Sequence, residues 1–460
     1  MKTSVNGPEE KDVLKIAVTA LAGSSIEWYD FFIYGTAAAL VFPTLFFSHD
    51  LPPLVAQLAA FSTFAVGFLA RPLGGLVFGH FGDKVGRKKA LVAALLMMGV
   101  ATTLIGCLPT YQQVGAAAPV ALILLRFAQG LAVGGQWGGA ILLATESAPI
   151  NKRGFYGSFA QVGVPVGVVL ANLVFLLMTA RIAPDAFQAW GWRVPFLLSV
   201  VLVGVGLYVQ LKLEETPVFK QLEAIKHAKN EAELAEQAAR RGVSVDVIRA
   251  EAAALKKRSP VFEVFRSHPR QILLTTGAMI AINGNFYILI TFVIAYGVRT
   301  VGLAQKEVLL AVLVGSLFMV PALLISAAIS DRIGRRGIYM AGAILLGIFS
   351  FAFFPMVAAG TPLMVTAAIA IGLVLLSLMY GPQGAFFAEL FSAKVRYSGA
   401  SLGYQLGAIL GGGFAPIIAT ALLAKYGSAV PISIYMAGMC AVSLLSVYLL
   451  SETYKNEEEV

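Results

Sequence analysis

Long apolar runs alternate with short polar segments along almost the whole chain. Many of these runs reach the roughly 20 residues that a helix needs to cross the hydrocarbon core of a bilayer. The pattern predicts an all-α membrane protein with twelve spans. To within several residues, the spans cover 14–42, 54–78, 90–109, 119–145, 155–180, 193–213, 270–298, 307–329, 338–359, 362–388, 397–424 and 430–450.

A charged cluster between two spans occurs twice. Asp83 is followed by Gly86 and then by basic residues, and Asp331 is followed at the same spacing by Gly334 and Arg335. A long internal repeat in so apolar a chain indicates a duplicated membrane protein.

A second pair of features agrees with this duplication. Glu146 precedes Arg153 by seven residues, and Glu389 precedes Arg396 by the same distance. We therefore expect two pseudo-symmetric six-helix bundles, 1–213 and 270–460. The hydrophilic interval 214–269 favours short cytoplasmic helices. It acts either as a solvated linker or as a surface for regulation or a partner.

Composition supports a membrane location. Hydrophobic residues make up 58% of the chain and charged residues 13%, against roughly 45–50% and about 25% in soluble domains. The 34 Lys and Arg residues lie mostly in the predicted inner segments, apart from Arg181, Arg193, Arg299, Lys306 and Lys425 outside and Arg71 and Arg126 within spans. The positive-inside rule then predicts that both termini are cytoplasmic. The net charge of +9 reflects membrane orientation, so we expect a lipid bilayer and no nucleic acid as partner.

Several kinds of chemistry are disfavoured by the sequence. The histidines form no ligand pair four residues apart, and the cysteines Cys107 and Cys440 are far apart in predicted spans. There is no Ser/His/Asp arrangement and no Gly-Lys-Ser/Thr phosphate loop. We expect no enzyme activity, metal or cofactor, and no pump driven by ATP.

The motifs resemble the major facilitator superfamily, whose signature matches the repeated charged loop. More narrowly, the segments that begin at Glu27, Arg71 and Arg126 resemble the metabolite:proton symporters, as does the segment from Gly191 to Phe196. That group includes carriers for shikimate, 2-oxoglutarate, citrate and proline/betaine. The resemblance covers nearly the whole chain and implies a monomeric transporter of the bacterial inner membrane that works by alternating access.

Charged residues gather at the inner ends of the predicted helices: Asp83, Arg87, Glu146, Arg153, Asp331, Arg335, Glu389 and Arg396. We expect opposite charges there to hold the halves together while the cavity faces outward. Exposed pairs contribute only about 0–1 kcal/mol each, but a network biases states that differ by a few kcal/mol. The alternative is that these charges only satisfy insertion and helix dipoles.

Two carboxyl groups lie inside the first predicted span. Glu27, Asp30 and Tyr34 share one helical face, and Asp30 is near the middle of the helix. Burial favours the protonated form of a carboxyl group and a nearby cation the charged form, so such a group loads and releases a proton as its surroundings change. Asp30 is the first candidate for proton coupling and Glu27 the second or a tuning partner. A static ion pair with an arginine is the alternative.

The two arginines within the spans are candidates for the substrate site. Arginine stays protonated and presents a planar fork that matches a carboxylate. Pairing of Arg71 and Arg126 with Glu27 or Asp30 is the rival interpretation. Further candidate contacts are Tyr34, Gln129, Gln136, Trp137, Asn283, Tyr287, Tyr380, Gln383, Tyr404 and Gln405. Such polar and aromatic groups also bridge helices in any bundle.

Together with the resemblance, these features predict a symporter that uses the proton gradient to import a small organic acid. Two arginines and the neutral Gln136, where many relatives have Glu, favour an anion over a zwitterion. A proline/betaine-type zwitterion symporter is the main alternative. A drug/proton antiporter and a non-transporting sensor are further alternatives.

Overall fold

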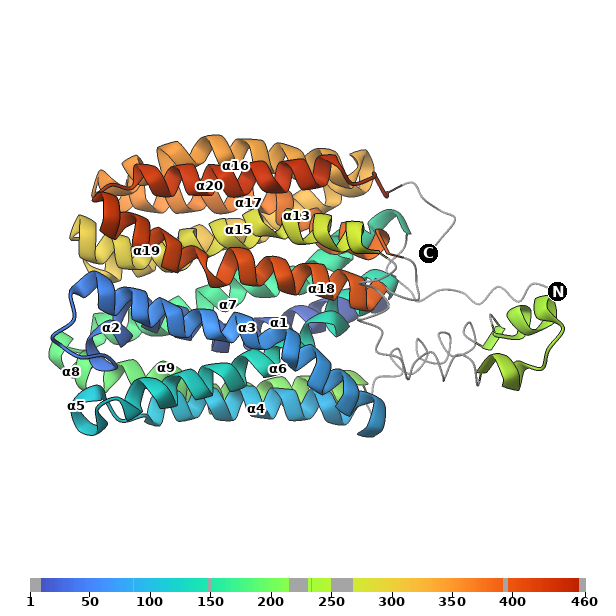
Figure 1. Ribbon diagram of the computed structural model, residues 1–460, viewed down its shortest axis with the longest axis horizontal. Helices are drawn as coiled ribbons and strands as arrows, with labels where there is room; N and C mark the ends of the chain where they lie inside the picture. Colours follow the sequence, from blue (N-terminus) through green and yellow to red (C-terminus); the bar gives the residue numbers. More distant parts are fainter. Residues whose placement is uncertain are drawn as a thin grey trace.

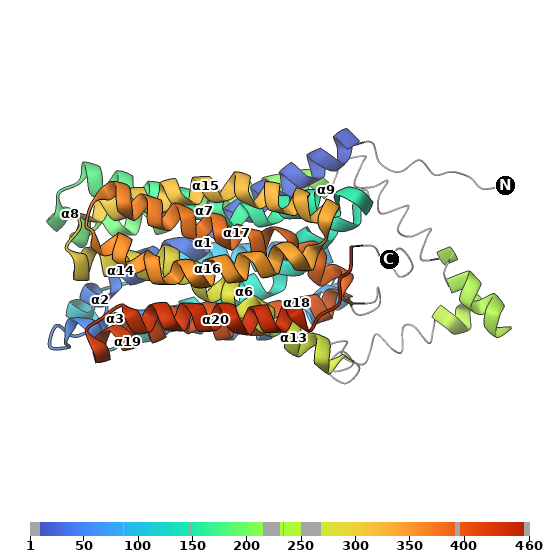
Figure 2. The same cartoon turned by 90° about the horizontal axis from the view of Figure 1, so that it is seen from above.

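The computed structural model describes residues 10–85, 87–147, 150–214, 231–232, 234–249, 268–391 and 396–454. Throughout this part of the chain the secondary structure is helical (Figure 1). The long helices run side by side along the long axis of the molecule, and the polar connections lie at its two ends (Figures 1 and 2). Apolar sequence therefore forms the transmembrane part, as the hydropathy pattern predicts.

The first half contains six long helices, which are α1 (Glu10–Leu40), α3 (Pro53–Val85), α4 (Arg87–Cys107), α6 (Ala117–Ser147), α7 (Arg153–Arg181) and α9 (Val194–Glu214). Short helices α2 (Phe42–Leu45), α5 (Tyr111–Val114) and α8 (Pro184–Ala189) lie in the connections. Each long helix corresponds to one predicted span.

The second half repeats this arrangement. Its helices are α13 (Pro269–Tyr287) with α14 (Val293–Tyr296), α15 (Gln305–Ile333), α16 (Arg335–Ala358), α17 (Pro362–Glu389), α18 (Arg396–Ala408) with α19 (Ala415–Tyr426), and α20 (Val430–Tyr448). The π-helical turns η3 (Ile288–Phe292) and η4 (Gly297–Val301) continue α13, and η5 (Ile409–Gly413) joins α18 to α19. Periodicity alone did not predict these turns.

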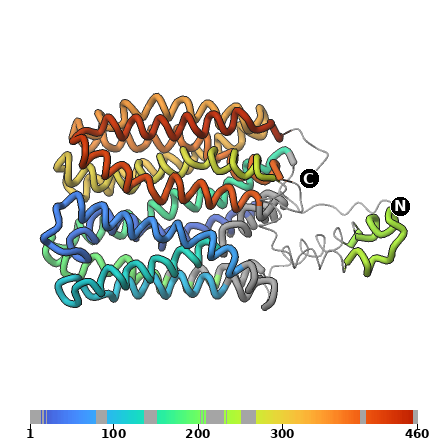
Figure 3. The backbone as a smooth tube through the Cα atoms, in the orientation of Figure 1, coloured from blue at the N-terminus to red at the C-terminus, as the bar shows by residue number. Residues whose placement is uncertain are grey.

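Within the described residues, nine helical segments are long and apolar enough to cross a membrane, and the shorter apolar stretches Val92–Cys107 and Gly191–Val201 add two more. Helix α1 completes the twelve-helix set. The backbone tube shows the blue-to-green half beside the yellow-to-red half (Figure 3). In the interval 214–269, the structure describes 214, 231–232, 234–249 and 268–269. Of these, 234–241 and 245–249 are helical around a turn at Gly242.

The two halves meet along matched pairs of helices. Helix α7 packs against α15 and α17, and α3 packs against α18, η5 and α19. Gly412 shows how close the second contact is, because a Cβ atom there would lie 2.7 Å from the ring of Tyr287 and 2.9 Å from that of Phe68. Helix α1 begins and α20 ends at one end of the bundle (Figure 2), which we call the terminal end.

Candidate functional site

Two arginines are fully buried in the first half. Arg71 on α3 is 1% exposed and Arg126 on α6 is 0% exposed. Their guanidinium carbons lie 4.4 Å and 4.0 Å from the centre of the Phe31 ring, so both cations contact the same aromatic side chain. Further rings enclose them: Trp28 and Phe68 at Arg71, and Tyr34 and Phe64 at Arg126.

Of the guanidinium nitrogens of Arg71 and Arg126, only one has a hydrogen-bond partner in the described part of the chain. Nη1 of Arg126 donates to Oε1 of Gln129 at 3.0 Å, and Nε2 of Gln129 donates to Oγ1 of Thr102 at 2.7 Å. The other two nitrogens of Arg126 and all three of Arg71 are buried without a hydrogen-bond partner. Among the described residues, no carboxylate forms an ion pair with either guanidinium.

The rings stabilise the buried cations but do not replace hydrogen bonds. A desolvated cation–π contact contributes about 2 kcal/mol, and burial of an unpaired ion costs several kcal/mol even after relaxation. Three rings at each guanidinium offset much of this cost, but five nitrogens remain without an acceptor. An anionic group that entered this site would find donors already desolvated and held in place.

A glycine makes room for one of the cations. A Cβ atom at Gly67 on α3 would lie 2.5 Å from Nε of Arg126. The absence of a side chain there lets the guanidinium lie directly against α3. Sequence reasoning missed Gly67, and it missed Phe31 because one more aromatic in an apolar helix carries no separate signal.

The two carboxyl groups of α1 lie apart from the arginines. Asp30 is 0% exposed. Its neighbour is the hydroxyl of Ser199 on α9, although neither side chain makes a hydrogen bond of normal geometry. Glu27 is partly buried. The alternative of a static ion pair with Arg71 or Arg126 is therefore not what the structure shows.

A small cavity lies between the halves. It is lined by Trp28, Val164, Ile282, Asn283, Phe286, Tyr287, Leu376, Tyr380 and Tyr404. Its volume of about 20 Å³ is room for about one water molecule, so a metabolite fits there only after the surrounding helices move apart. Trp28 and Tyr287 connect it to the arginines, because Trp28 contacts Arg71 and Tyr287 contacts Phe68.

The other predicted substrate contacts lie in different places in the structure. Asn283, Tyr287, Tyr380 and Tyr404 line the cavity. Tyr34 and Gln129 hold Arg126, Gln383 bonds to Gln161 of the other half, and Gln405 is buried outside the lining. The side chains of Gln136 and Trp137 lie outside the described part of the structure. Gln161 was missed by sequence reasoning.

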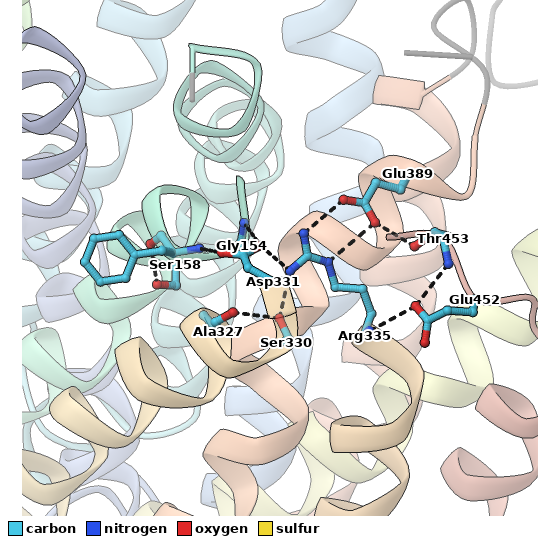
Figure 4. A network of polar contacts seen from close by, with 10 residues as sticks. Gly154, Ser158, Ala327, Ser330, Asp331, Arg335, Glu389, Glu452 and Thr453 are labelled. Atoms are coloured by element: carbon cyan, nitrogen blue, oxygen red, sulfur yellow. Dashed lines mark hydrogen bonds and ion pairs between the residues drawn. The ribbon is translucent and has the colours of Figure 1, made fainter. Parts of the chain in front are cut away.

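Asp331 forms a charged contact between the halves at the terminal end. Both of its carboxylate oxygens accept hydrogen bonds from backbone N–H groups at the start of α7, from Gly154 at 2.9 Å and from Phe155 at 2.9 Å (Figure 4). The start of a helix carries unpaired donors and partial positive charge. A carboxylate from one half thus caps a helix of the other.

Arg335 positions this carboxylate from within the second half. It pairs with Asp331, and its Nη2 lies 3.1 Å from Oε1 of Glu389 (Figure 4). Glu389 also accepts a hydrogen bond of 2.6 Å from Thr453. These ion pairs join α15, α16 and α17 of the second half.

The chain after α20 returns to the same network. The carboxylate of Glu452 accepts hydrogen bonds from the backbone N–H groups of Arg335 at 2.9 Å and Arg336 at 3.0 Å, which begin α16.

Among the other predicted gating charges, Arg153 also makes polar contacts. The side chains of Asp83, Arg87, Glu146 and Arg396 lie outside the described residues, and the gating role of all eight charges stays a prediction.

The profile of the family described as "Sugar (and other) transporter" matches residues 15–458. The chain belongs to this family, within the major facilitator superfamily. Membership in the superfamily and the twelve-helix fold, both predicted from the sequence, are confirmed.

Relatives of this transporter cover nearly the whole chain. The inner membrane metabolite transport protein YhjE of Escherichia coli (strain K12) is 42% identical over 447 residues, which are 95% of this chain and 94% of the relative. The shikimate transporter of the same strain is 38% identical over 446 residues, 96% of this chain and 95% of the relative. The proline/betaine transporter of that strain is 31% identical over 444 residues, 96% of this chain and 84% of the relative.

Solved structures agree with the fold. A crystal structure of a D-xylose-proton symporter has a TM-score of 0.71 and 16% identity, and covers 96% of this chain and 99% of that one. The relatives are transporters of small molecules, so this protein is a membrane transporter and not an enzyme.

Proposed function

We propose that this transporter is a proton-coupled symporter of the bacterial inner membrane that imports a small organic acid. The observation that carries the proposal is the pair of buried guanidinium groups with five unpartnered nitrogens. Arginine remains charged in proteins. The missing negative charge is supplied by the carboxylate of the cargo.

The free edge of Arg126 suits a carboxylate. Nη1 is engaged by Gln129, which leaves Nε and Nη2 unpartnered. These two nitrogens are the donors of a bidentate fork, the geometry that pairs with the two oxygens of a carboxylate. Neither arginine lines the cavity, whose wall includes Trp28, a neighbour of Arg71, so the halves must rearrange before cargo reaches the guanidinium groups.

Proton coupling is assigned to Asp30, with Glu27 as the second candidate. A charged carboxylate buried without a partner is costly, so gain or loss of a proton at Asp30 is tied to a change in its surroundings. Asp30 lies on the α9 side of α1, not in the cavity lining. Proton coupling therefore acts through movement of α1, because the ring of Phe31 on this helix contacts both arginines.

Uptake into proteoliposomes tests the proposal. Labelled mono- and dicarboxylic acids, proline and betaine are offered with and without an inward proton gradient. The proposal expects gradient-driven accumulation of an acid. Accumulation of proline or betaine alone would show that the cargo is a zwitterion and not an organic acid. Efflux driven by the gradient would indicate an antiporter.

A further inference from the structure

A pair of glutamines bridges the two halves beside the cavity. Nε2 of Gln161 on α7 donates to Oε1 of Gln383 on α17 at 2.8 Å. The two side chains are 1% and 0% exposed. If both side-chain amides were rotated by half a turn, one hydrogen bond between them would remain, because each amide carries a donor nitrogen and an acceptor oxygen on the same carbon.

The spacing places this pair directly on the floor of the cavity. Gln161 is three residues before Val164 and Gln383 is three residues after Tyr380, and both of those residues line the cavity. Residues three apart lie on the same helical face. Since α7 starts and α17 ends at the terminal end, both glutamines lie one turn closer to that end than the cavity does.

The pair differs from the charged contact further out. The capping contact of Asp331 on Phe155 lies six residues, or about 9 Å, nearer the terminal end along α7. The contact between Gln161 and Gln383 is neutral, and its other two polar atoms, Oε1 of Gln161 and Nε2 of Gln383, are buried without partners. Water or a polar ligand group that enters would satisfy all four atoms, so the bond is easily exchanged.

We propose that Gln161 and Gln383 form the inner gate of this transporter. The bond between their amides closes the floor of the cavity while cargo is enclosed. Its exchange for water or for a polar group of the cargo opens the path to the terminal end. The charged contact at Asp331 closes the mouth, and the glutamine pair closes the cavity itself.

A cysteine reporter in the cavity tests the gate. Leu376→Cys is placed in a background with Cys107→Ala and Cys440→Ala, and a membrane-impermeant thiol reagent is applied from the terminal-end side in oriented vesicles. Gln161→Met and Gln383→Met keep the side-chain size but remove the bond. Each variant is expected to raise the labelling rate about three- to tenfold, the effect of one buried hydrogen bond.

The double variant decides whether the two residues act as a pair. Because both single changes remove the same bond, Gln161→Met with Gln383→Met is expected to raise labelling no more than the larger single effect. Unchanged labelling in the single variants, or additive increases in the double variant, would overturn the proposal. Gln57→Met is the matched control, since Gln57 is buried but bonds to Ala38 of its own half.

Gln161→Asn provides the same test if a methionine variant does not yield monodisperse protein. It keeps the amide but is one methylene shorter, so it too is expected to raise labelling. The assay uses neither cargo nor a proton gradient. A failed gate therefore leaves the proposed symport untouched, and a failed uptake experiment leaves the gate to be judged by labelling alone.

Discussion

Replacement of Arg126 by lysine tests how the buried charge is used. Arg126→Lys keeps one positive charge but removes the planar fork formed by Nε and Nη2, the two nitrogens that have no partner in the protein. It also removes the bond from Nη1 to Gln129. The perturbation therefore changes geometry at constant charge.

The expected magnitude follows from these contacts. A hydrogen bond to a charged group contributes about 1.5–3 kcal/mol, and lysine retains at most one of the two cargo contacts. Loss of the other corresponds to a roughly 10- to 150-fold higher half-saturation concentration, since about 1.4 kcal/mol is tenfold. The assay is initial uptake of the labelled acid into proteoliposomes at a fixed inward proton gradient.

Arg193→Lys is the matched control for this variant. Arg193 also lies against an aromatic ring, that of Trp192, and donates to the carbonyl oxygens of Gly106 and Leu108. Arg193 does not line the cavity. The half-saturation concentration of Arg193→Lys is therefore expected to stay within twofold of that of the unaltered transporter. The same small change in Arg126→Lys would refute the assignment of that guanidinium to the cargo.

Three further variants probe other parts of the mechanism. Asp30→Asn should abolish gradient-driven accumulation but retain exchange of labelled for unlabelled acid. If accumulation persists in this variant, Asp30 does not carry the coupled proton. Asp331→Asn weakens the cap on Gly154 and should raise cavity labelling from the terminal-end side several-fold. Unchanged labelling would mean that the cap does not bias the conformation. Gly67→Ala should displace Arg126 and raise the half-saturation concentration several-fold, measured against Gly438→Ala, where a Cβ atom meets nothing within 4 Å.

The fold was predictable because its determinants are local and repeated. Apolar runs between charged connections fixed the helices, and the recurrence of the cluster at Asp83 and Asp331 fixed the two halves. The π-helical turns were not predictable. One of them, η5, lies where the halves pack closely, as at Gly412 against Phe68, and hydropathy carries no record of such a contact.

The site was predictable in its charges but not in its arrangement. A charged residue within a span is a signal by itself, which singled out Arg71 and Arg126. That both would lie against Phe31, with Asp30 turned toward α9, depends on the relative rotation of several helices. Gln161 carried no signal because one neutral residue in an apolar helix is common.

Glu452 lies between these cases. In the sequence, Glu214-Glu215-Thr216 follows the last span of the first half and Ser451-Glu452-Thr453 follows that of the second, but nothing in the sequence gives a reason for this similarity. The structure supplies one, because the Glu452 carboxylate caps the start of α16. The similarity is visible in the sequence, whereas the partner of Glu452 became evident only from the packing of the chain.

The most direct test of the buried arginines is a structure of the protein with a transported acid bound. The account predicts a carboxylate oxygen about 2.7–2.9 Å from a guanidinium nitrogen of Arg71 or Arg126. An acid bound elsewhere, with both guanidinium groups still in contact only with Gln129 and the surrounding rings, would contradict it.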